Sequence, residues 1–162
     1  MAPLEREVAY LNAADDDEAG YEDRLGRSLR TTRRPDAFKL LVTIKALGVD
    51  GLGVLVDRCH ALAQLAYRAA AEHPALEVHS PPTLTTVLLR PSIDDPAARD
   101  EACAQLRREL LRTGRAVVGR TELPGTGAGR RWLKLTLLHP GAADEAVTAL
   151  VGLVGEAAAR QA

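Results

Sequence analysis

The sequence lacks several features that would place it in a special class of protein. Cys59 and Cys103 are its only cysteines, which disfavours a disulfide framework and predicts two buried thiols in a reducing compartment. No apolar run approaches the roughly 20 residues that a membrane-spanning helix needs, and residues 1–7 contain no basic and then apolar leader. The sequence therefore predicts a cytoplasmic protein that does not enter a membrane.

Charge of neither sign predominates. Lysine and arginine total 21, aspartate and glutamate total 22, and the formal net charge is -1, so no nucleic-acid partner is expected. The four histidines, at positions 60, 73, 79 and 139, have no ligand-like spacing, and no metal site is predicted. A length of 162 residues with 46% hydrophobic residues is typical of one soluble globular domain.

Apolar periodicity, together with glycine and proline positions, predicts four helices and four strands. Helices are expected over residues 36–47, from residue 52 to a stop at 73–74, over 96–113 and around 147–154; strands are expected over 76–79, 83–89, 115–121 and 130–138. The glycine-rich segment 125–129 lies between two strands, so it is interpreted as a hairpin loop, not as a phosphate-binding turn. The order of elements predicts an α/β fold with an open sheet and helices on one face.

The helix after residue 52 has the clearest pattern in the chain. Its apolar residues follow the helical period and predict one buried face: Leu52, Leu55, Val56, Cys59, Leu62, Ala63 and Ala66. Residues 13–35 have poor apolar periodicity, with an acidic run followed by five arginines. We therefore expect a flexible arm over residues 1–35 and a folded domain over residues 36–162.

Four blocks point to a family when they are taken in order. They lie at residues 28–53 with 56–58, at 85–90, at 114–121 and at 133–140. Together they resemble the C-terminal part of the group II pyridoxal-phosphate-dependent decarboxylases, which include aromatic-amino-acid, glutamate and diaminobutyrate decarboxylases. The resemblance covers about residues 8–155. It implies the small α+β domain of fold-type I enzymes, with a mainly antiparallel sheet and a mobile loop before it.

In that family the cofactor is bound by a lysine that follows a histidine, and no lysine of this sequence does so. The resemblance therefore implies one half of a split decarboxylase-like enzyme that acts on an amino-acid-like substrate. Pyridoxal phosphate would be bound mainly by a separate lysine-bearing chain. Two alternatives remain open: an excised fragment of a full-length decarboxylase, or a non-catalytic binding or regulatory module. The module predicts a chain without a large exposed apolar patch.

The same resemblance suggests site residues. Thr32, Arg33 and Arg34 correspond to positions at the family's dimer interface, with Thr32 beside the neighbouring subunit's substrate. The alternative is that the arginines belong to a solvated arm. Lys134 stands where family members often place a cation near the substrate carboxylate, or it is a strand lysine that reaches solvent.

The family's catalytic tyrosine position is occupied here by Arg24, with Tyr21 one helical turn earlier. An arginine cannot donate a proton at neutral pH because its guanidinium stays charged. Either Tyr21 takes the role or the usual protonation step is lost, which would allow a different outcome such as oxidative deamination. Pro35 and His139 also depart from the family's usual residues, and they are consistent with a diverged member.

Overall fold

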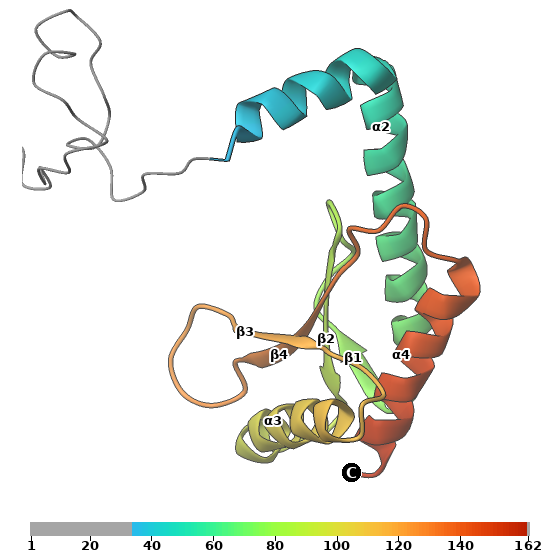
Figure 1. Ribbon diagram of the computed structural model, residues 1–162. Coiled ribbons are helices and arrows are strands. Elements are labelled where there is room, and N and C mark those ends of the chain that lie inside the picture. The colour runs from blue at the N-terminus through green and yellow to red at the C-terminus, as the bar shows by residue number, and fades with distance from the viewer. Residues whose placement is uncertain (1–33, 162) are drawn as a thin grey trace, which may run out of the picture. The chain divides into compact units, whose positions relative to one another are not determined.

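The computed structural model describes residues 34–161 (Figure 1). Its elements are α2 (Asp36–Ala71), β1 (Leu76–Val78), β2 (Thr86–Pro91), α3 (Pro96–Arg112), β3 (Gly119–Glu122), β4 (Arg131–Thr136) and α4 (Asp144–Ala159). The chain divides into two compact units, one ending at Gly48 and the other beginning at Val49. The predicted arm over residues 1–35 lies almost wholly outside the described residues.

The second unit is built on a four-stranded sheet in the order β1-β2-β4-β3. All three strand pairs are antiparallel, and β3 and β4 form the hairpin predicted around the glycine-rich segment. The predicted α/β fold, with an open antiparallel sheet and helices against one face, is confirmed. In Figure 1 α4 and the part of α2 that follows Gly48 run alongside the sheet, while α3 crosses near one end.

The core lies between the sheet and these helices. Alternate residues of β2 and β4 point into it, so that Val87, Leu89, Leu133 and Leu135 are buried. Facing them are Leu62, Ala63, Ala66 and Ala70 from α2, Cys103, Leu106 and Leu110 from α3, and Val147, Val151 and Val154 from α4. Cys59 and Cys103 are both buried free thiols, as predicted, and burial raises the pKa of Cys103 to about 11.

Helix α2 departs from the helical backbone at Gly48, whose φ of 71° and ψ of 171° suit a residue without a side chain. The sequence predicts a stop at this glycine, and the unit boundary falls there. Asp36 is the first residue of the helix, and its carboxylate lies 3.4 Å from the ammonium of Lys39.

The buried face predicted for the helix after residue 52 is only partly correct. Cys59, Leu62, Ala63 and Ala66 are buried, whereas Leu55 is 39% exposed and Val56 is 54% exposed. The nearest loops of the sheet meet α2 at Arg58 and His60, through the carbonyls of Ala142 and Pro82. Beyond those contacts the apolar face is only partly covered by the described residues.

Strand β3 begins at Gly119, four residues later than predicted. The N–H groups of Arg115 and Ala116 both donate to the carbonyl of Leu110, so this segment completes the end of α3 and does not pair with β4. Gly114, predicted as the stop after α3, has a φ of 67°. Among the residues that the structure describes, no helix is long and apolar enough to cross a bilayer.

Candidate functional site

Lys134 lies on β4, on the sheet face opposite the core. Its cross-strand neighbours are Leu88 on β2 and Gly119 on β3. A Cβ at Gly119 would lie 3.0 Å from the carbonyl oxygen of Lys134 and 3.7 Å from its Cε, so glycine relieves a close contact with the backbone of β4, and the lysine stem lies beside it. Two residues along the strands, Thr86 and Thr136 pair with each other and are exposed. This half of the sheet face is therefore open, with one cation at its centre.

The other half of the same face is closed by Trp132. Its ring is buried, with the guanidinium carbon of Arg90 3.9 Å from the ring centroid. The ring of His79 packs edge-on against the same tryptophan, at 5.2 Å between centroids. Stacking of a guanidinium on an indole is a favourable cation–π contact. A buried aromatic block therefore adjoins Lys134 and separates the open half of the face from the end of the sheet where α3 begins.

Arg90 carries a buried charge, and its partners compensate for it fully. Its Nε and one terminal nitrogen donate to both carboxylate oxygens of Glu77, at 2.9 and 2.7 Å, and its other terminal nitrogen donates to the carbonyl of Gly129 at 2.8 Å. Arg99 donates to the same Glu77 at 3.1 Å. The two arginines hold the pKa of Glu77 below its usual value against the opposing effect of burial.

Asp100 on α3 fixes the other side of the β3–β4 loop. One carboxylate oxygen accepts the N–H of Gly129 at 2.8 Å, and the other accepts the N–H of Arg131 at 2.8 Å. Gly129 has a φ of 83°, and a Cβ there would come within 3.0 Å of Pro96. The backbone donors lower the pKa of Asp100 although its burial acts in the opposite direction. Glycine is therefore required where the loop returns to the sheet.

The pair formed by Glu77 and Arg90 should make stability depend on pH. Because folding lowers the pKa of Glu77, the unfolded chain binds a proton more readily, so this contribution is present above pH 4.5 and is lost as pH falls through the lower folded value. Glu77→Gln should reduce the free energy of unfolding at pH 7 by about 1–2 kcal/mol, since the carboxylate is partly exposed. It should also flatten the pH dependence below pH 4.5.

Urea unfolding at pH 7, 5, 4 and 3 tests this expectation. Glu101→Gln is the matched control, because its carboxylate pairs with Arg108 and both side chains are more than half exposed. A Glu77→Gln protein with the pH profile of the parent protein would contradict the assigned role.

The structure describes two of the proposed site residues. Lys134 is exposed on the open half of the sheet face, and Arg34 is exposed at the start of the described part of the first unit, where its carbonyl accepts the N–H of Asp36. The two residues belong to different units, and each is described by itself. Tyr21, Thr32 and Arg33 lie outside the described residues, so their roles stay predictions.

The sequence alone assigns no role to the cluster of Glu77, Arg90 and Trp132. The available signal was an arginine at the end of the apolar run at residues 87–89, since an arginine buried in a strand needs a partner. Its partner, Glu77, lies on a neighbouring strand. Only the strand register, which a single sequence does not reveal, identifies that residue.

The described residues do not by themselves suit the binding of pyridoxal phosphate. Each of the three lysines of the chain, at positions 39, 45 and 134, is exposed. A lysine that attacks a carbonyl is normally desolvated or placed beside another cation, so that its amine is not fully protonated. No described lysine is in such an environment, and Lys39 is paired with Asp36.

The sequence is similar to curated decarboxylases over most of its length. It is 35% identical over 159 residues to an L-2,4-diaminobutyrate decarboxylase of Rhizobium meliloti (strain 1021), covering 98% of this chain and 31% of that protein. It is 32% identical over 136 residues to the L-2,4-diaminobutyrate decarboxylase of Acinetobacter baumannii, covering 83% of this chain and 26% of that one. The chain thus spans less than a third of either relative. No protein-family profile matches the sequence.

The fold is also similar to solved structures. One is the glutamate decarboxylase domain of diaminobutyrate-pyruvate transaminase and L-2,4-diaminobutyrate decarboxylase from Vibrio parahaemolyticus. The two share 30% identity and superpose with a TM-score of 0.67, which covers 80% of this chain and 27% of that one.

Proposed function

Because the chain resembles, in sequence and in fold, the C-terminal part of group II pyridoxal-phosphate-dependent decarboxylases, we propose that it supplies the small-domain half of a decarboxylase-like enzyme. The cofactor lysine would lie on a separate chain. The observation that carries the proposal is that the similarity spans nearly the whole chain yet less than a third of its relatives, while every lysine here is exposed. If these residues belong to a longer polypeptide, the same partner would lie in that polypeptide.

The first unit supports a need for a partner. Between residues 36 and 47 the helix has a polar stripe of Asp36, Lys39 and Thr43, with Lys45 on another side, and the remaining residues are apolar. Its exposed large apolar side chains are Phe38, Leu40, Leu41, Val42 and Leu47. A helix that is apolar on most sides is normally buried on most sides. This exposure supports a shared enzyme over a free-standing module, since such a module predicts no large exposed apolar patch.

When bound, pyridoxal phosphate supplies the electron sink for loss of the carboxylate. The role proposed for this chain is to orient the substrate and to keep water away from it. Lys134 would attract the substrate carboxylate with its ammonium, while its stem stays beside Gly119. Thr32, Arg33 and Arg34 would complete the interface around the substrate, and Tyr21 would hold the proton that is delivered after carboxylate loss.

A cation that attracts the carboxylate equally in the ground state and in the transition state contributes to substrate affinity and not to the chemical step. Lys134→Met should therefore raise KM about tenfold while changing kcat little. Lys45→Met removes another exposed lysine and should leave both constants within about twofold. Equal effects of the two substitutions on KM would contradict the role of Lys134.

Reconstitution tests the proposed function itself. The chain would be co-expressed with the lysine-bearing chain encoded nearest to it, and release of CO₂ from L-2,4-diaminobutyrate would be measured with pyridoxal phosphate present. Activity in the mixture, with none in either chain alone, is expected. Activity of this chain alone would contradict the claim that it lacks the cofactor lysine. A complex that forms but remains inactive with a panel of amino acids would favour a regulatory module.

A further inference from the structure

The apolar face of α2 continues past the end of the core that covers it. Cys59, Leu62, Ala63 and Ala66 face the sheet and are buried, but the same stripe one to two turns earlier contains Leu55 and Val56, which are 39% and 54% exposed. Val54, at 66%, widens the bare region. One apolar face thus has two halves, and the described chain covers only one of them.

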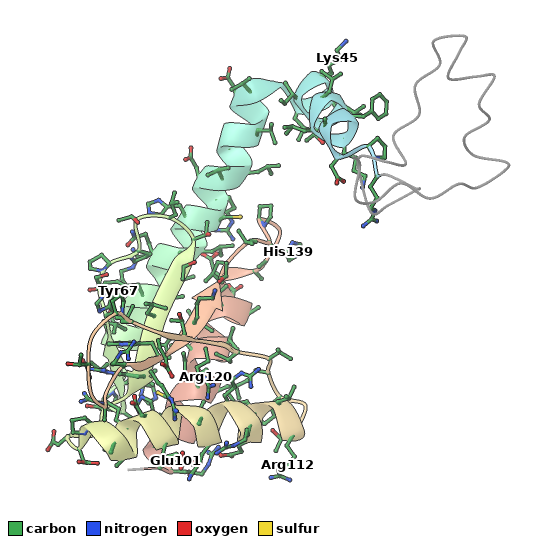
Figure 2. The ribbon with its side chains drawn as sticks, turned by 90° about the vertical axis from the view of Figure 1, so that its left-hand side faces the viewer. Lys45, Tyr67, Glu101, Arg112, Arg120 and His139 are labelled. Atoms are coloured by element: carbon green, nitrogen blue, oxygen red, sulfur yellow. The ribbon has the colours of Figure 1, made fainter. Side chains whose placement is uncertain are left out.

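Two loops contact α2 at the boundary between the buried and the exposed parts of its apolar face. Arg58 donates to the carbonyl of Ala142 at 2.9 Å in the loop before α4, and Gln64 donates to the carbonyl of Pro82 at 2.9 Å in the loop before β2. Figures 1 and 2 agree in placing the β4–α4 loop, which carries the labelled His139, beside α2. Each loop therefore meets α2 on the sheet side of the bare turns.

Both loops also expose an apolar residue of their own. Leu84 is 67% exposed and Leu138 is 69% exposed. The two loops adjoin each other, because the N–H of Leu137 donates to the carbonyl of Thr85 at 2.8 Å. Together with the bare turns of α2 they form what we call the apolar end of the second unit: Val54, Leu55, Val56, Leu84 and Leu138. Such a concentration of exposed apolar side chains at one end of a domain is typical of an interaction surface.

We infer that the apolar end is the surface on which the cofactor-bearing chain docks. This inference rests on the proposed function and names the part of the molecule that meets the partner. More than two thirds of each curated relative has no counterpart in this chain. The partner proposed to supply that part is therefore large enough to cover the exposed continuation of the apolar face of α2. The five residues that define the surface are apolar, as expected for a permanent interface, and the exposed Asp57 and the Arg58–Asp144 ion pair lie beside them.

The position of Lys134 fits this occupant. Thr86 and Thr136 lie on the open half of the sheet face, and the chain runs on from them to Leu84 and Leu138. Lys134 is two residues from Thr136 on the same face. A partner seated on the apolar end would therefore border the open half of the sheet face, where the lysine points.

Replacing single apolar residues by lysine tests the surface. Val56→Lys and Leu138→Lys each place an ammonium in the middle of the proposed interface, and Leu111→Lys is the matched control, since Leu111 is a 52% exposed apolar residue on α3. All three residues are exposed, so the melting temperature of each variant should match that of the parent. Affinity for the co-expressed lysine-bearing chain would be measured by isothermal titration calorimetry after separate purification.

The expected result is a Kd at least tenfold higher for Val56→Lys and for Leu138→Lys, with Leu111→Lys within twofold of the parent. A complex that tolerates all three substitutions would overturn the docking surface and leave the proposed function standing. If the parent complex forms but has no decarboxylase activity, and the two substitutions abolish that complex, the result would support the docking surface and count against the proposed function. Absence of any complex would overturn both.

Analytical ultracentrifugation of this chain alone tests the other possible occupant of the apolar end, a second copy of the same chain. A concentration-dependent dimer that Val56→Lys dissociates, combined with unchanged binding of the lysine-bearing chain, would assign the apolar end to a second copy of this chain and would overturn the inference.

Discussion

Replacement of Trp132 by alanine is expected to lower the free energy of unfolding by about 3–5 kcal/mol. The indole is 4% exposed although it lies on the sheet face opposite the core, which none of the described helices covers. Its removal would leave a cavity and would also remove the ring on which the buried Arg90 guanidinium rests, 3.9 Å from the centroid. The remaining partners of Arg90, Glu77 and the Gly129 carbonyl, would then have to hold the charge without the stack.

Trp132→Phe is the matched control, because it keeps an aromatic face beneath the guanidinium and fills part of the volume. It should cost clearly less than alanine. Trp132 is the only tryptophan of the chain, so both substitutions remove the tryptophan fluorescence signal. Urea unfolding of all three proteins is therefore followed by far-ultraviolet circular dichroism. A loss below about 1 kcal/mol for Trp132→Ala would mean that the site collapses around the missing ring, and that the stack is not a principal support of the sheet.

Alanine should have opposite effects at two glycines of α4. A Cβ at Gly155 would overlap with the ring of His73, whose Nδ1 accepts the N–H of Ala75 at 3.2 Å. Gly155→Ala should therefore displace the ring and cost about 1–3 kcal/mol of unfolding free energy. Gly152 has no atom within 4 Å of its would-be Cβ. Gly152→Ala should stabilise the protein by up to about 1 kcal/mol, through helix propensity alone.

Thermal unfolding of the two variants tests this contrast. The double variant with His73→Ala removes the ring that causes the overlap, so in that background Gly155→Ala should become neutral or stabilising. If Gly155→Ala destabilises equally with and without His73, the contact between the ring and the helix is not the cause. The test separates local crowding from any general intolerance of α4 to substitution.

The sequence predicted elements well where packing is local. Apolar spacing located α3 and α4, and the stops at Gly48 and Gly114 coincide with glycines of positive φ. The start of β3 was misplaced because residues 116–118 form an apolar run that fits a strand. The N–H groups of Arg115 and Ala116 donate to the end of α3 instead, and hydrophobicity does not report that competition.

The site was less predictable than the fold, for a physical reason. Lys134 could be named because the family resemblance places it, whereas the partnership of Arg90 with Glu77 depends on strand register and was not anticipated. Periodicity assigned Leu55 and Val56 to a buried face, but both are exposed in the described chain. Periodicity does not tell which molecule buries an apolar stripe, because the spacing of the residues is the same whatever covers them. The sequence therefore did not reveal that the described chain leaves these two residues exposed.

The β3–β4 loop is secured at its base and free at its tip. Asp100 and Arg90 bind the backbone where the chain re-enters the sheet, whereas residues 124–128 are all exposed. Changes in the length of the tip should therefore leave the strand register undisturbed, because the bonds that set the register lie below it. This loop is consequently where the domain can accept new chain in the course of evolution, or a reporter peptide in the laboratory, without cost to the sheet that carries Lys134.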